Sequence, residues 1–271
     1  MALTPLQRDI CRRLAARRLA SGESYVAGGA ALQEALAADR VSRDIDIFAD
    51  TAEAVAAAWD GDREALKAVG YDVAVLRERP GYVEARVAHG RDAVRVEWAQ
   101  DSAFRFFPLV EHPDFGLALH PFDLSTNKVL ALVGRLEARD WIDVIECAEH
   151  LQPLGYLAWA AAGKDPGFTP QGILAAAGRS SRYTHAEIES LDFSGAVPNV
   201  ADLSVRWHRH LRQADDICAL LPPDCVGHAV LTQDGALFAG DPPDLTSALG
   251  RRALVFHPGR IRGAFPQLKT R

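Results

Sequence analysis

The sequence has few cysteines, and those it has are scattered. The four among its 271 residues are Cys11, Cys147, Cys218 and Cys225. This spacing fits neither a zinc motif nor a redox pair, so a metal-bound or disulfide-based scaffold is not expected. Burial as small hydrophobic side chains in a reducing compartment is the simplest interpretation, and it favours the cytoplasm.

Long hydrophobic runs and an excess of positive charge are also missing. No run approaches the roughly 20 apolar residues that a membrane helix needs. The N-terminal segment MALTPLQRDICRRLAARRLA has arginines throughout and no apolar stretch, so neither a secretory signal nor a membrane partner is expected. The net charge of −6 gives no overall attraction to nucleic acid, so any such contact would depend on a local basic patch.

The sequence does have the composition of a globular protein, with 48% hydrophobic and 24% charged residues. Strand-like segments at 24–27 and 44–48 flank a short helical segment. After a helix over 52–69, three strand-like runs between 71 and 99 are separated by RPG and HGR, which predicts a meander. Helical periodicity dominates from about residue 123 to 221, and a hairpin signal follows at Asp234-Gly235.

For the first half of the chain these patterns predict an α+β or α/β arrangement with a mixed sheet, and for the whole chain we expect an α+β fold whose mixed sheet has flanking helices. We expect three parts: an α/β core over 1–120, a helical domain over 121–221 and a small β-hairpin region over 222–271.

Two aspartates in the segment DIDIF are the first chemical signal. Residues two apart in a strand point to the same side, so Asp44 and Asp46 project together. Two carboxylates so close repel unless something positive lies between them, and Mg²⁺ prefers carboxylate oxygens. The alternative is an exposed strand whose acidic side chains simply contact water.

The surroundings of this pair favour the metal. Gly28 and Gly29 fall at a strand-to-helix junction, where a phosphate can approach the backbone and the helix N-terminus. Glu97, in the alternating segment VRVEW, is placed to stand on a neighbouring strand. Three carboxylates on adjacent strands predict a phosphoryl-transfer site with one or two Mg²⁺ ions.

The sequence here resembles a known family. GGAAL and the pattern R-x-S-x-D-I-D-x-F over 40–48 are similar to the motifs of AbiEii-type nucleotidyltransferase toxins, from bacterial toxin–antitoxin and phage-defence systems. These toxins lie within the superfamily that includes DNA polymerase β. KVLALVGRLEARDWIDV resembles the lysine helix of the family. The resemblance covers roughly residues 25–146.

The resemblance implies a fold, an activity and partners. It implies a nucleotidyltransferase core that binds an NTP and transfers NMP to a hydroxyl of tRNA or another macromolecule, with a possible antitoxin protein as partner. It assigns Asp44, Asp46 and Glu97 to the metal, and Gly28, Gly29 and Ser42 to the nucleotide. The family usually has Thr or Ser after the glycines; here Ala30 keeps the backbone donors but loses one side-chain contact.

The basic segment after residue 127 is the second candidate element. In an unbroken helix, Lys128, Arg135 and Arg139 would share one face and offer cations to a triphosphate. Asp143 would orient Lys128 or Arg139, or act on the acceptor hydroxyl. The alternative is a surface network in which these cations pair with the acidic residues Glu137, Asp140, Asp143 and Glu146.

Three other functions compete with a macromolecule-modifying transferase. An antibiotic-modifying adenylyltransferase shares the Gly-Gly and D-I-D-I pieces. A degenerate binding protein on the same fold is suggested by Ala30 but opposed by the intact acidic residues. A glycosyltransferase also uses D-x-D, but the glycine turn only about 15 residues upstream disfavours it.

Overall fold

The computed structural model describes residues 3–180 and 183–267. The chain divides into two compact units, each built from several segments. Unit 1 comprises Met1–Ala103, Leu109–His120 and Asp192–Gly195, and unit 2 comprises Phe104–Pro108, Pro121–Leu191 and Ala196–Arg271. A segment of unit 1 thus ends at His120, and residues 222–271 belong to unit 2.

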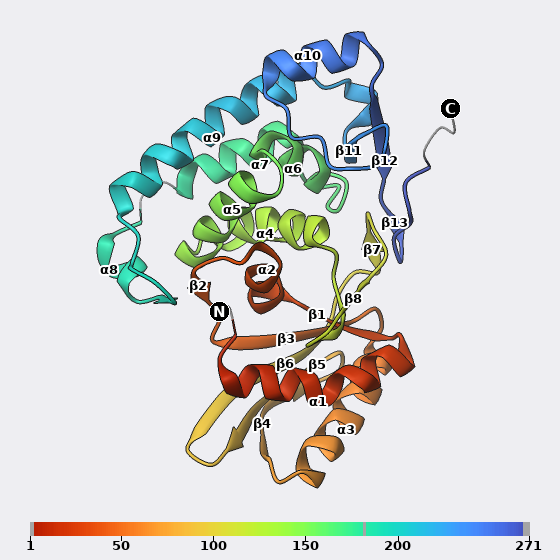
Figure 1. Cartoon of the computed structure of the whole chain (residues 1–271), viewed down its shortest axis with the longest axis vertical. Helices are drawn as coiled ribbons and strands as arrows, with labels where there is room; N and C mark the ends of the chain where they lie inside the picture. The colour runs from red at the N-terminus through yellow and green to blue at the C-terminus, as the bar shows by residue number, and fades with distance from the viewer. Residues whose placement is uncertain (1–2, 181–182, 268–271) are drawn as a thin grey trace. The chain divides into compact units, whose positions relative to one another are not determined.

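Unit 1 is built on one mixed sheet. Its strands are β1 (Ser24–Ala27), β2 (Arg40–Val41), β3 (Asp44–Ala49), β4 (Asp72–Arg79), β5 (Tyr82–His89), β6 (Asp92–Gln100), β8 (Val110–His112), β9 (Gly116–Ala118) and β10 (Asp192–Phe193). Seven of them form a sheet in the order β4-β5-β6-β3-β1-β9-β8 (Figure 1). The pairs β3–β6 and β1–β9 are parallel, and β2 pairs with β10 outside this sheet.

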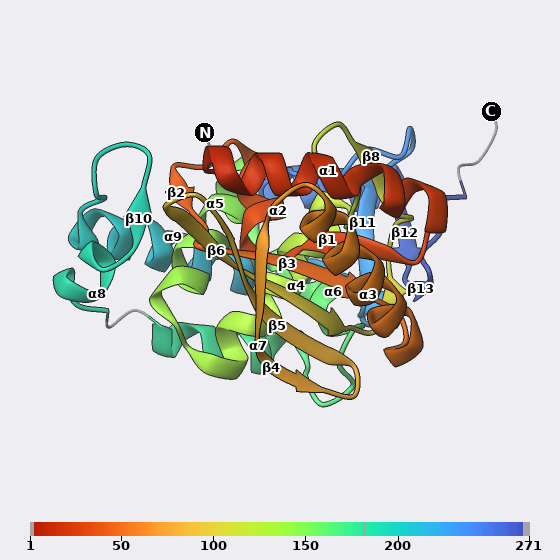
Figure 2. The same cartoon turned by 90° about the horizontal axis from the view of Figure 1, so that it is seen from below.

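The two faces of the sheet follow from alternation along its central strands. In β3, Ile45 and Ile47 are buried, whereas Asp44 and Asp46 on the other face are only half-buried. Two helices, α1 (Pro5–Ser21) and α3 (Ala52–Ala68), pack against the sheet and lie together in front of it in Figure 2. Trp98 of β6 is fully buried beneath them and donates to Asp62 of α3 at 3.0 Å. The opposite face is therefore the one that carries the charged side chains.

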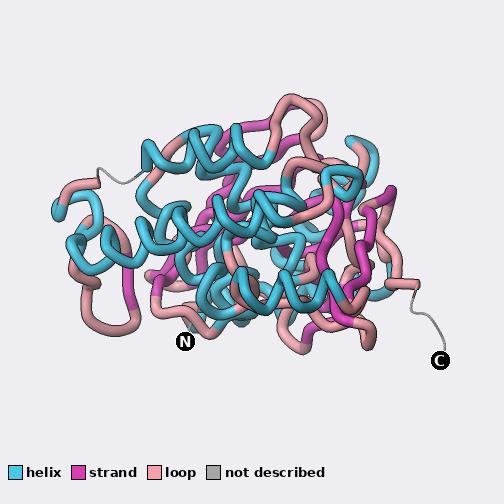
Figure 3. The backbone as a smooth tube through the Cα atoms, turned by 90° about the horizontal axis from the view of Figure 1, so that it is seen from above, coloured by secondary structure: helices cyan, strands magenta, loops and turns pink. Residues whose placement is uncertain are grey.

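Unit 2 is mainly helical, and Figure 3 shows the helices of the chain in cyan. Its helices are α4 (Pro121–Arg135), α5 (Ala138–His150), α6 (Leu154–Ala161), α7 (Pro170–Ala177), α8 (His185–Glu189), α9 (Val200–Leu220) and α10 (Pro242–Gly250). The long helix α9 packs against α5, α6, α7 and α10. Within residues 3–180 and 183–267, no helix combines the length and apolar character needed to cross a bilayer.

The strands of unit 2 pair over longer distances than the sequence indicates. They are β7 (Phe104–Arg105), β11 (His228–Thr232), β12 (Leu254–Pro258) and β13 (Arg260–Ile261). The turn at Asp234-Gly235 forms, with a single bridge between Leu231 and Leu237. The ladder partner of β11, however, is β12, which follows α10, and β13 pairs with β7.

Candidate active site

The parallel pairing of β3 and β6 brings the predicted acidic residues onto one face of the sheet. Asp46 lies opposite Glu97 in this register, and Asp44 lies opposite Arg95. Residues paired across neighbouring strands share a face, so Glu97 projects beside the two aspartates. All three carboxylates are half-buried.

Arg95 is the residue of this site that sequence reasoning missed. Its guanidinium donates twice to Asp44, from Nε to Oδ1 at 2.9 Å and from Nη2 to Oδ2 at 2.5 Å. It also lies 3.4 Å from Glu84 of β5 and 3.6 Å from Glu97. The hydrogen bond with Asp44 raises the pKa of Arg95 above its ordinary value, and the neighbouring acidic residues add to this. Its position two residues before Glu97 in VRVEW was the available signal.

The glycine turn lies against the second aspartate. Gly28 opens α2 (Gly28–Leu36) with φ +64°, and a Cβ added to it would lie 1.8 Å from Oδ2 of Asp46. A Cβ on Gly29 would lie 3.0 Å from Oγ of Ser42. The structure therefore brings together Gly28, Gly29, Ser42 and Asp46, and at Gly28 both the backbone conformation and the space require glycine.

The N-terminus of α2 has no capping side chain. The preceding residue, Ala27, makes no side-chain hydrogen bond to the first turn. The first backbone N–H groups of a helix have no partner within it, and together with the helix dipole they favour an anion. A phosphate beside the glycine turn would fit this end of the helix.

In unit 2, Lys128 is buried in an ion-pair cluster. Its side chain is 10% exposed and its Nζ lies 3.1 Å from Asp140 and 3.0 Å from Asp143, both of which are buried. Arg135 donates to both oxygens of Asp140, at 2.6 and 2.9 Å. Burial opposes ionisation of Asp140, but the Arg135 hydrogen bond and the Lys128 charge together lower its pKa. The pairing with acidic residues that was given as the alternative occurs, but for Lys128 it lies in the interior rather than at the surface.

The prediction that Arg139 continues the face of Lys128 and Arg135 is wrong. The helix α4 ends at Arg135, Leu136 takes φ +53°, and α5 begins only at Ala138. Arg139 therefore belongs to the second helix and pairs with Glu137 at 2.6 Å. Lys128 and Arg135, two helical turns apart on α4, do meet at one carboxylate, Asp140.

The carboxylates of unit 1 have the chemistry of a Mg²⁺ site. Asp44, Asp46 and Glu97 offer hard oxygen donors from one face of two strands, which is the donor set that Mg²⁺ prefers. Among the described residues, the group whose three ligand atoms already lie within 4.8 Å of one another is instead Glu146, Glu149 and His150, in α5. Two of these three residues, Glu146 and Glu149, already form ion pairs with Arg206.

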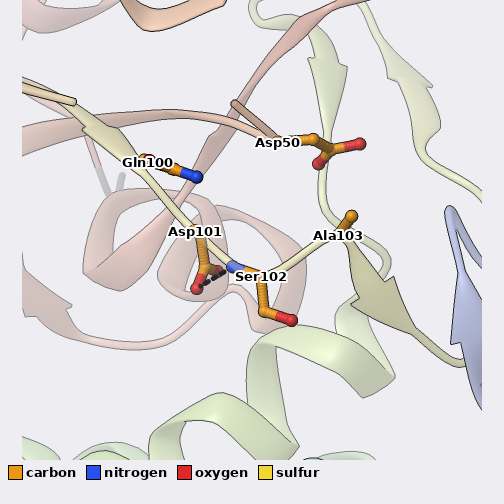
Figure 4. Close-up of a pocket in the computed structure, with 5 residues that line it drawn as sticks. All are labelled: Asp50, Gln100, Asp101, Ser102 and Ala103. Carbon is orange, nitrogen blue, oxygen red and sulfur yellow. Dashed lines mark hydrogen bonds between the residues drawn. The ribbon is translucent and has the colours of Figure 1, made fainter. Parts of the chain in front are cut away.

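A pocket of about 430 Å³ lies at the carboxyl ends of β3 and β6 (Figure 4). It is lined by Asp50, Gln100, Asp101, Ser102 and Ala103. One of its carboxylates, that of Asp101, accepts from the backbone N–H of Ser102 at 2.7 Å. None of the predicted site residues lines it.

Comparison with known proteins identifies the fold. No known family model matches the sequence, and no curated protein matches it. JHP933 from Helicobacter pylori is similar in structure at 14% identity, with a TM-score of 0.50 over 80% of this chain and 95% of that chain. This similarity establishes a shared fold, and the α+β fold class expected from the sequence is confirmed.

Two further solved structures are nucleotidyltransferases by name. One is a putative nucleotidyltransferase from H. pylori, 14% identical, with a TM-score of 0.49 over 81% of this chain and 100% of that chain. The other is MenT4, a nucleotidyltransferase toxin from Mycobacterium tuberculosis H37Rv, 15% identical, with a TM-score of 0.46 over 80% and 84% of the two chains.

The glycine turn generates the first prediction. Gly28→Ala should destabilise the fold and alter cation binding, because its Cβ would overlap the Asp46 carboxylate. Gly22→Ala is the matched control, since Gly22 has a similar φ of +67° with nothing within 4 Å of an added Cβ. The control should lose about 1–2 kcal/mol of unfolding free energy from the left-handed backbone alone. Denaturant unfolding and Mn²⁺ titration of both variants test this, and equal behaviour would contradict it.

The buried cluster of Lys128, Arg135 and Asp140 generates the second prediction. Asp140→Asn should lower the unfolding free energy by about 3–5 kcal/mol, because Lys128 and Arg135 would lose a buried counter-charge. Asp216→Asn, at an exposed position of α9, is the control and should change it little.

The same aspartate predicts a pH dependence. Since the pKa of Asp140 is lowered by folding, its contribution is complete above about pH 4 and is lost as the pH falls further toward the folded value. Unfolding curves between pH 7 and pH 3 should therefore converge for the wild-type protein and Asp140→Asn. Parallel curves would show that Asp140 is not the group responsible.

Proposed function

We propose that the protein is a Mg²⁺-dependent nucleotidyltransferase that transfers NMP from an NTP to a hydroxyl acceptor and releases pyrophosphate. The observation that carries this proposal is the contact between the glycine turn and the acidic face. Gly28 lies against Asp46, and Asp46 lies across from Glu97. A backbone that can bind phosphate is thus beside carboxylates that can bind the metal.

The residues of unit 1 take distinct roles in this reaction. Asp44, Asp46 and Glu97 would hold Mg²⁺, which stabilises charge on the phosphoryl oxygens and lowers the pKa of the attacking hydroxyl. The backbone N–H groups at Gly28 and Gly29 bind phosphate oxygens at the start of α2. The hydroxyl of Ser42, beside Gly29, provides a further phosphate contact.

The residues of unit 2 are proposed to bind the triphosphate. Lys128 supplies a point charge, and its contact with Asp143 at 3.0 Å supports a role for that carboxylate in orienting the lysine. Arg135, which shares α4 with Lys128, contributes a planar fork that suits phosphate oxygens. Action of Asp143 on the acceptor hydroxyl is the alternative role for that residue.

The acceptor is proposed to be tRNA or another RNA, in a toxin-type reaction controlled by an antitoxin protein. This assignment rests on the likeness of GGAAL, the pattern over 40–48 and the lysine segment to the AbiEii-type toxins. Labelled NTPs supplied one at a time with Mg²⁺ and total cellular RNA, with and without protein extract, would identify both substrates.

The metal ligands give the third prediction. Asp44→Asn and Asp46→Asn should each abolish transfer of label, because each removes a charged metal ligand. Both variants should stay folded, since a half-exposed ion pair such as that between Asp44 and Arg95 contributes at most about 1 kcal/mol. Asp92→Asn, at the exposed start of β6, is the control and should keep its activity. Full transfer by both site variants would refute the metal assignment.

Lys128 gives the fourth prediction. Lys128→Met should weaken NTP binding by about ten- to a hundredfold, the value of one charge-assisted contact. Lys164→Met is a matched control, because Lys164 is similarly buried in unit 2 and pairs with the buried Asp123 at 2.8 Å. Both variants should lose stability, but only the first should lose NTP affinity in calorimetric titration. Equal NTP affinities would remove Lys128 from the site.

A further inference from the structure

Arg95 occupies the space among the acidic side chains of the candidate metal site. It stands across from Asp44 in the β3–β6 register, and its guanidinium reaches carboxylates on three neighbouring strands. Both oxygens of Asp44 accept hydrogen bonds from it. A cation bound directly by Asp44 would need at least one of the same oxygens.

The spacing of the carboxylates agrees with this occupation. Within the described residues, Asp44, Asp46 and Glu97 do not form a group whose ligand oxygens all lie within 4.8 Å of one another. The guanidinium lies between two of them, since its Nε is 2.9 Å from Asp44 and 3.6 Å from Glu97. Three or four acidic side chains on one face repel one another, and a resident positive charge reduces that repulsion.

Arg95 can leave this position only by moving. A guanidinium does not lose its proton at any ordinary pH, so a change of ionisation cannot release Asp44. Its side chain is 44% exposed, and its flexible stem can turn the charged end toward water.

We infer that Arg95 is an internal counter-ion of the candidate metal site, and that a divalent cation binds Asp44 by displacing it. This inference rests on the proposed function, because it deepens the account of the same carboxylates. The free energy of metal binding is then reduced by the free energy of the Asp44–Arg95 contact that the metal has to replace. Arg95 is a positioning residue in this scheme, since it sets the resting geometry of the ligands.

Mn²⁺ binding to the metal-free full chain, followed by electron paramagnetic resonance without nucleotide, tests the inference. Arg95→Gln should bind Mn²⁺ up to about fivefold more tightly than the wild-type protein, because an ion pair of at most about 1 kcal/mol no longer competes for Asp44. Arg86→Gln is the matched control: Arg86 is an exposed residue of β5 in register with Arg95 on the same face. It should match the wild-type affinity.

A conservative variant separates displacement from simple charge. Arg95→Lys keeps the charge but cannot make the two-pronged contact, so this variant should bind Mn²⁺ with intermediate affinity. An Arg95→Gln affinity no higher than that of the wild-type protein or of Arg86→Gln would overturn the inference. So would an Arg95→Lys affinity equal to that of the wild-type protein.

Asp44→Asn distinguishes failure of this inference from failure of the proposed function. If Asp44→Asn abolishes Mn²⁺ binding while Arg95→Gln leaves the affinity unchanged, the metal site stands and the counter-ion role falls. If Asp44→Asn binds Mn²⁺ like the wild-type protein, the assignment of the metal to Asp44 falls, and the proposed mechanism falls with it.

Discussion

The parallel pairing of β3 with β6 is the constraint on which the rest of unit 1 depends. One register sets both faces of the sheet. It places Ile47 beside Trp98 on the covered face and Asp46 beside Glu97 on the other. A slip of one residue would turn every side chain of a strand to the opposite face, exposing the isoleucines and burying the acidic residues. The apolar packing under α1 and α3 therefore fixes the positions of the candidate ligands.

The two units hold their charged residues in different ways. On the sheet of unit 1, Asp44 and Arg95 are open enough for water and ions to compete with their contact. In unit 2, Lys128 and its two aspartate partners are buried, so their arrangement is set by packing of α4 against α5. Removing one member of the Lys128 cluster leaves an uncompensated charge in the interior, whereas Asp44 and Arg95 can exchange each other for water or ions.

The sequence predicts the local parts of this structure well. The strand over 24–27, the glycine turn, the D-x-D strand and the meander after residue 71 are strong periodic patterns with clear turn residues, and the structure confirms them. The break after Arg135 had only a weak signal in Gly134, because Leu136, where the chain turns, is a good helix former and rarely takes a positive φ. Arg139 was misplaced for that reason.

Contacts between distant segments were beyond the reach of periodicity. The alternation of VRVEW places Arg95 on the same face as Glu97, but it does not indicate that Arg95 contacts Asp44, because the pairing register of β3 and β6 is a tertiary property. The same holds for β11, whose local turn at Asp234-Gly235 forms while its ladder partner comes from beyond α10.

The division of the chain into interleaved segments has a consequence for how the protein can be cut. The segment Phe104–Pro108 belongs to unit 2, where the backbone N–H groups of Phe106 and Phe107 donate to Asp123. The strand β10 belongs to unit 1 although it lies between segments of unit 2. A truncation after residue 120 would keep the segment Phe104–Pro108 but remove its partner Asp123. It would also remove β10, the pairing partner of β2. No single proteolytic cleavage can release either unit whole, so the two units have to be produced as one piece.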